Sequence, residues 1–173
     1  MAFINRTVRM AIEANSLYIT TVPLPVPGRF HWSFVHVDED GRCTKHHWVT
    51  ATIDSSGPEA YVPHSLPYGA LNHTHNLSIL AYFKISDYTP TNLDEFKCIC
   101  AEVFPQSYPS AAQNRVNGIS CRTWITHILS RLLSAERANQ IEAMVTERST
   151  PCSDEYATSF LHRRPYITIM VDI

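Results

Sequence analysis

The sequence predicts an α+β fold in which a central antiparallel sheet is packed by two or three helices. β-rich segments fill the first half of the chain, helical periodicities follow from about residue 91, and a short β-rich segment returns near residue 170. Strands followed by helices and a return strand are typical of α+β proteins. A length of 173 residues fits a single domain, 1–173. With 45% hydrophobic and 17% charged residues, the chain can bury a sizeable core.

The strand predictions depend on alternation of apolar residues and on enrichment in β-branched and aromatic residues. FHWSFVHV at 30–37 is the strongest such pattern, and the turn Asp-Glu-Asp-Gly leads into CTKHHWVTATI at 43–53. These two segments are expected to pair as an antiparallel hairpin. The other expected elements are extended segments within 6–22, a proline- and glycine-containing loop at 54–74, a strand at 75–85 and a last strand at 166–171.

The helix predictions depend on apolar spacing and on capping residues. Thr91 is expected to cap a first helix that ends at Pro105, and an irregular loop should follow as far as Gly118. A second helix is expected from Ser120 to about Leu133, and a third, weaker one over about 135–148.

Charge and cysteine usage restrict the possible partners and the compartment. A net charge of −2, with a single short basic cluster at 162–164, argues against binding of nucleic acid. Arg6, Arg9 and Glu13 interrupt the first segment, so no signal peptide is expected, and the apolar runs are too short to span a bilayer. Five cysteines without a C-x-x-C pair then predict free thiols and a cytoplasmic location.

The segment Ser120-Cys121-Arg122-Thr123-Trp124 carries the main chemical signal. Serine is a good N-cap, which places Cys121 at the first helical position. Free backbone N–H groups and the helix dipole stabilise a thiolate there and lower its pKa. The competing interpretation is that Cys121 is a small core residue, since it shares a helical face with the apolar residues Trp124, Ile125, Ile128 and Leu132.

His31 is the candidate base, because an imidazole within an apolar strand needs a partner or a task. A third residue depends on the loop between the two hairpin strands. A loop of two or four residues places His46 on the face of His31 and Ser33, whereas a loop of three or five residues places His47 there. A polar side chain at that position would fix the tautomer of the imidazole.

The strand Phe30-His31-Trp32-Ser33, followed by a polar strand and then by a helix that opens at Cys121, resembles the permuted papain-like thiol enzymes. These include the lecithin:retinol acyltransferase type, the small phospholipase/acyltransferases and the PPPDE-type isopeptidases. The resemblance implies Cys121 as nucleophile, His31 as base and His46 as the orienting residue. The chain also looks like a fungal group of proteins without an assigned function, over roughly residues 25–135.

The expected function is therefore acyl transfer to, or hydrolysis of, an amide, ester or thioester in a small-molecule, lipid or peptide substrate. Ser120, Trp32 and Trp124 are expected to contact that substrate, and backbone N–H groups near Ser120 are expected to receive the oxyanion. No cofactor and no metal are expected. His73 and His75 could share a strand face, but no carboxylate nearby completes a ligand set.

Two alternatives from other classes remain open. One is a non-catalytic binding domain on the same fold, in which Cys121 is a buried core thiol. The other is a small-molecule enzyme that uses histidines without the thiol. The distance between the Cys121 sulfur and the His31 ring is the observation that separates them. The sequence does not predict an oligomeric state.

Overall fold

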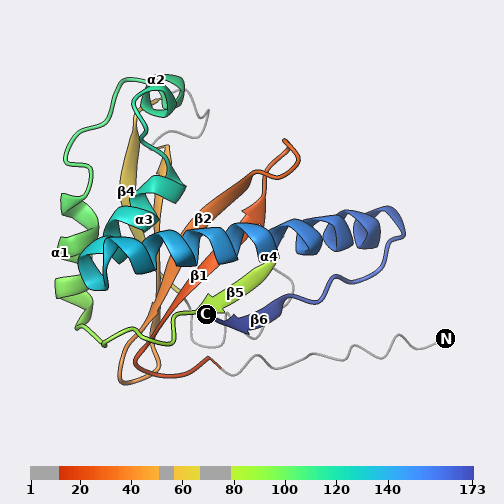
Figure 1. Cartoon of the computed structure of the whole chain (residues 1–173), viewed down its shortest axis with the longest axis horizontal. Helices are drawn as coiled ribbons and strands as arrows, with labels where there is room; N and C mark the ends of the chain where they lie inside the picture. The colour runs from red at the N-terminus through yellow and green to blue at the C-terminus, as the bar shows by residue number, and fades with distance from the viewer. Residues whose placement is uncertain (1–11, 51–56, 67–78) are drawn as a thin grey trace.

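The computed structural model describes residues 12–50, 57–66 and 79–173. Its strands form one six-stranded sheet in the order β4-β3-β2-β1-β5-β6 (Figure 1). The strands are β1 (Ser16–Pro23), β2 (Phe30–Val37), β3 (Cys43–Thr50), β4 (Glu59–Ser65), β5 (Ala81–Lys84) and β6 (Ile169–Asp172). The helices are α1 (Leu93–Glu102), α2 (Ala111–Val116), α3 (Cys121–Leu132) and α4 (Ala135–Leu161). The α+β prediction is confirmed.

The first four strands form an antiparallel meander. The predicted hairpin is present, with Val37 paired to Cys43 and Ser33 paired to His47. Its loop therefore contains the five residues 38–42, in which the Asp38 carboxylate accepts hydrogen bonds from the backbone of Asp40 and Arg42. Such aspartate-to-backbone bonds are typical of turns.

The sheet is mixed, which corrects the expectation of a wholly antiparallel sheet. β5 pairs antiparallel to β1, but β6 pairs parallel to β5, with Ala81 opposite Ile169. A parallel neighbour requires a crossover connection, and here α1 to α4 supply it.

The main core lies between one face of the sheet and the helices, with α3 and α4 crossing that face in Figure 1. Alternate strand residues such as Ile19, Phe34 and Phe83 meet Trp124 and Ile128 of α3 in this cluster. The opposite face carries a smaller cluster of Tyr18, Val35, Val37 and Tyr82. Because strand side chains alternate between the two faces, every second strand residue faces α3 and the residues between them face away from it.

Three local predictions were wrong, each for a physical reason. β4 lies within the predicted loop 54–74, because Pro63 is tolerated in a strand that has a neighbour on only one side. α2 lies within the predicted loop 105–118, where the Ser110 side chain caps a helix of six residues. Asn92, and not Thr91, caps α1.

α4 extends 13 residues beyond the expected end of the third helix and contains Pro151. Proline removes a helical hydrogen bond, so packing must hold this part of the helix. Ser149 and Cys152 are buried against the sheet side, and the Ser149 hydroxyl hydrogen-bonds to the Thr21 hydroxyl of β1 at 2.9 Å. Among the described residues, no helix is both long enough and apolar enough to span a bilayer.

All five cysteines are free thiols, and three of them, Cys100, Cys121 and Cys152, are buried. We expect alkylation of the unfolded chain under non-reducing conditions to modify all five. Intact-mass measurement checks this directly, and a protein carrying only three modified thiols would contradict it.

Candidate active site

Cys121 occupies the first position of α3, as predicted. The Ser120 hydroxyl accepts a hydrogen bond from the Thr123 N–H at 3.1 Å, and the Thr123 hydroxyl oxygen accepts one from the Ser120 N–H at 2.9 Å. This reciprocal capping box fixes the start of the helix, so the position of Cys121 relative to the sheet is fixed as well. The side chain is buried, with 9% of the residue surface exposed.

The sheet opens between β2 and β3 near this helix start. The last β2–β3 pair is Ser33 with His47, whereas β3 remains paired to β4 as far as Thr50 with Glu59. Residues 30–32 therefore have a partner on β1 but none on β3.

The backbone N–H of Trp32 points into this opening. The Thr21 carbonyl accepts from Leu80, so Thr21 directs its backbone groups away from β2, and its neighbour Val22 bonds with His31 instead. Because successive residues of a strand direct their backbone groups to opposite sides, Trp32 directs its N–H toward β3. That N–H interacts with the Cys121 thiol. The sulfur thus lies against the backbone of the residue that follows His31.

Burial is the largest influence on the Cys121 thiol and raises its pKa. The backbone N–H groups of Trp32 and Arg122 and the charge of Arg115 lower the pKa, and the charge of Glu59 raises it. The net direction is upward, which corrects the expectation of a lowered pKa. The helix terminus does favour the thiolate, as predicted, but desolvation outweighs it, so the group is a neutral thiol near neutral pH.

His31 projects from β2 toward the face opposite the helices, because Trp32 and Phe34 occupy the helix side. Its Nε2 is buried and has no hydrogen-bond partner, and burial lowers its pKa to about 4. The Cys121 thiol and the His31 imidazole are therefore both neutral near pH 7. No hydrogen bond joins the His31 ring to the Cys121 sulfur. Cys121 contacts β2 through the Trp32 N–H at the opening of the sheet, one residue after His31, whereas the His31 ring lies on the other face.

The five-residue loop places His47, and not His46, on the face of His31. The pairing of Ser33 with His47 places His47 on the face of His31, and the two ring centroids lie 5.8 Å apart in an edge arrangement. His46 lies on the helix side instead, where its Nδ1 hydrogen-bonds to the Tyr61 hydroxyl at 2.8 Å. The expectation that His46 orients His31 is therefore wrong, since a strand side chain cannot reach the opposite face.

The three residues expected to contact a substrate have structural roles. Trp32 and Trp124 are 2% and 0% exposed, and the Trp124 Nε1–H donates to the Cys100 carbonyl at 3.0 Å. The Ser120 hydroxyl belongs to the capping box. That the three side chains contact a substrate stays a prediction.

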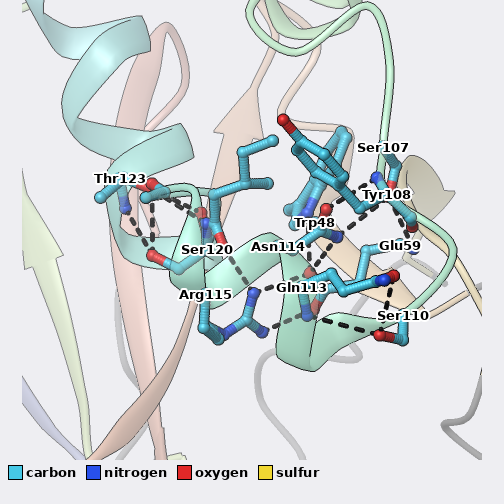
Figure 2. Close-up of polar contacts among 12 residues, drawn as sticks. Trp48, Glu59, Ser107, Tyr108, Ser110, Gln113, Asn114, Arg115, Ser120 and Thr123 are labelled. Atoms are coloured by element: carbon cyan, nitrogen blue, oxygen red, sulfur yellow. Dashed lines mark hydrogen bonds and ion pairs between the residues drawn. The ribbon is translucent and has the colours of Figure 1, made fainter.

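An ion pair with a buried carboxylate, next to the site, was missed by the sequence reasoning (Figure 2). The side chain of Glu59, at the start of β4, is 4% exposed and pairs with Arg115 of α2. Both residues lie in segments that the sequence predicted to be loops, where charged residues are ordinarily solvated. A carboxylate immediately after Gly57-Pro58 gave no periodic signal that could have indicated burial.

Among the described residues, no group of three histidine, cysteine or acidic side chains is arranged to hold a metal ion. Comparisons of the chain with protein-family models, with curated proteins and with solved structures found no match in any of the three.

Proposed function

We propose that the chain is a Cys–His thiol enzyme of the permuted papain-like type, which transfers or hydrolyses an acyl group. Cys121 is the nucleophile, His31 the base, and His47, in place of His46, the residue beside the base. The single observation that carries the proposal is the contact of the helix-opening Cys121 with the Trp32 backbone, one residue after His31, where the sheet opens.

The protonation states support a general-base mechanism. In this mechanism the His31 ring reaches the Cys121 sulfur through the opening between β2 and β3, and its neutral imidazole, with an unpartnered Nε2, accepts the thiol proton as the sulfur forms its bond to the carbonyl carbon. The bond to the leaving group then breaks, and His31 returns the proton to that group. Water, an amine or an alcohol then attacks the acyl carbonyl carbon as His31 takes its proton, and the bond to Cys121 breaks as His31 returns that proton to the sulfur.

The start of α3 also offers a donor for the oxyanion. The N–H groups of Ser120 and Thr123 are engaged in the capping box, and the Arg122 N–H faces the sulfur. The Cys121 N–H has no hydrogen-bond partner among the described residues. A free first-turn N–H beside the nucleophile is the kind of group that stabilises a tetrahedral intermediate.

Trapping of an acyl-enzyme tests the proposal. Incubation with activated acyl thioesters of short and long chain length should add one acyl mass to the protein, and peptide mapping should place it on Cys121. Cys121→Ala should abolish the adduct. Cys152→Ala is the matched control, because Cys152 is also buried but lies on α4, and this variant should be acylated like the parent.

The base has its own expected result. His31→Gln should slow acylation of Cys121 by about 10²–10⁴-fold, which is the usual contribution of a positioned general base. His127→Gln, a change of an exposed histidine on α3, should leave the rate unchanged. Equal rates for His31→Gln and the parent would exclude His31 as the base.

A non-catalytic binding domain is the second candidate, and the burial and raised pKa of Cys121 favour it. On that reading the thioesters acylate the exposed Cys98 while Cys121 stays unmodified until the protein unfolds. The same peptide map therefore distinguishes the two candidates.

A further inference from the structure

We propose that the Glu59–Arg115 ion pair is a positioning device for Cys121, which holds the chain just before α3 and presents a paired charge to the site. In calling Cys121 a nucleophile the inference rests on the proposed function, but its test needs no substrate. Glu59 belongs to β4 and Arg115 to α2. The pair therefore connects the edge strand β4 to the segment that leads into α3 (Figure 2).

The pair joins a buried carboxylate, Glu59, to a partly exposed guanidinium, Arg115. Arg115 Nη1 donates to Glu59 Oε2 at 2.7 Å, and Arg115 Nη2 donates to Glu59 Oε1 at 2.5 Å. Glu59 Oε2 also accepts from Asn114 Nδ2 at 2.8 Å and from Trp48 Nε1 at 3.3 Å. Bidentate contacts of this kind fix the guanidinium plane, and the additional donors offset the cost of burying the carboxylate.

Arg115 also contacts the backbone just before Cys121, so its position affects the position of the nucleophile. Its Nη1 also donates to the Ile119 carbonyl at 2.7 Å, two residues before Cys121. The Ile119 N–H in turn donates to the Asn114 carbonyl at 2.8 Å, across a turn in which Gly118 has φ +74°. Hydrogen bonds therefore hold both the carbonyl and the N–H of Ile119 just before the capping box begins. A shift of Arg115 should then shift the start of α3.

The charges of the pair act with opposite signs on both proposed catalytic groups. Arg115 lowers the pKa of Cys121 and the pKa of His31, whereas Glu59 raises both. A role in packing alone would give the two residues equivalent behaviour, because loss of either partner loosens the same segment. Opposite effects from the two partners are therefore the signature of a charge that acts on the site.

The experiment is the pH profile of iodoacetamide labelling of Cys121, followed by peptide mass spectrometry. Glu59→Gln, which keeps the size and a hydrogen-bond acceptor, should move the labelling midpoint down by about 0.5–1 pH unit, less than the shift from a directly contacting charge. Arg115→Gln should move it up by a similar amount. Each shift corresponds to a change of about threefold to tenfold in thiolate fraction at fixed pH below the midpoint.

Arg115→Lys serves as the rescue variant, because lysine keeps the charge but loses the bidentate contact. Its midpoint should stay closer to the parent than that of Arg115→Gln. The matched control is Asp87→Asn, which breaks the partly exposed Asp87–Arg137 pair and should leave the Cys121 profile unchanged.

Faster labelling in both Glu59→Gln and Arg115→Gln would overturn the proposal and leave a purely structural ion pair. An Arg115→Lys midpoint shifted as far as that of Arg115→Gln would overturn the charge component. Because alkylation requires no turnover, the opposite shifts can be observed even if no acyl-enzyme forms, so failure of this inference and failure of the proposed function are separate results.

Discussion

Replacement of Trp124 by alanine should lower the free energy of unfolding by about 3–5 kcal/mol, the usual cost of truncating a buried aromatic residue. Trp124 is fully buried, its ring stacks on Tyr61 at a centroid distance of 5.6 Å, and it contacts Phe34 at 6.0 Å. The change also removes the donor to the Cys100 carbonyl, which lies in the last turn of α1 and has no helical partner. The result is a cavity together with an unsatisfied buried acceptor.

Urea unfolding followed by tryptophan fluorescence and circular dichroism measures this loss. Phe160→Ala is the matched control, since it also removes an aromatic ring but from a residue that is 74% exposed. Surface substitutions of this kind ordinarily change stability by less than about 0.5 kcal/mol. A loss below about 1 kcal/mol in Trp124→Ala would contradict the central position of this residue between the sheet and α1.

Acidification should destabilise the protein steeply below pH 6.5. Burial lowers the folded-state pKa of His31 to about 4 and those of His46 and His47 to about 3. The native state therefore binds fewer protons than the unfolded chain below the unfolded pKa of 6.5. The stability that comes from keeping these rings neutral is complete above pH 6.5 and is lost as the pH falls toward 4.

His46 offers the clearest test, because it is completely buried and its Nε2 has no partner. Burial is the largest cause of its lowered pKa, the charge of Lys97 adds to it, and His36 and His47 would add to it when protonated. A histidine that titrates only in the unfolded chain contributes a slope of at most about 1.4 kcal/mol per pH unit. Urea unfolding between about pH 7 and about pH 5, where carboxylates stay ionised, measures the slope.

His46→Gln removes the titrating ring, and its slope should be shallower than that of the parent. His127→Gln, the exposed control, should reproduce the parent slope. A parent stability that is constant between pH 7 and pH 5 would show that the buried histidines take up protons without unfolding, and the assignment of these rings as desolvated would be wrong.

Local patterns predicted most of the fold because the residues concerned decide their structure locally. Ser120 caps α3, and the β-rich segments around the Asp-Gly turn pair as expected. The errors involve segments that only distant contacts hold in place. Packing of Ser149 against Thr21 of β1 stabilises α4 on both sides of Pro151. β6 can pair in parallel only after β5 has taken its place in the sheet.

The candidate site was predictable in its residue types but not in its geometry. The face that each histidine occupies depends on a loop of five residues rather than four, and Asp-Glu-Asp-Gly is compatible with either length. The pKa of Cys121 depends on how deeply its thiol is buried between α3 and the sheet. Capping residues do not determine that burial. Glu59 and Arg115 lie 56 residues apart in sequence and meet only in the folded chain.

The parallel pairing of β6 implies an order in which the protein folds. The Tyr166 hydroxyl donates to the Leu80 carbonyl across 86 residues, and the Ile173 N–H donates to the Lys84 carbonyl at 2.8 Å. Closing so long a loop is entropically costly unless the helices between the two strands have already packed. Until β6 arrives, one flank of β5 carries unpaired backbone groups that can bind a strand of another molecule. Refolding at high protein concentration therefore competes with association through this flank, although the native sheet covers it.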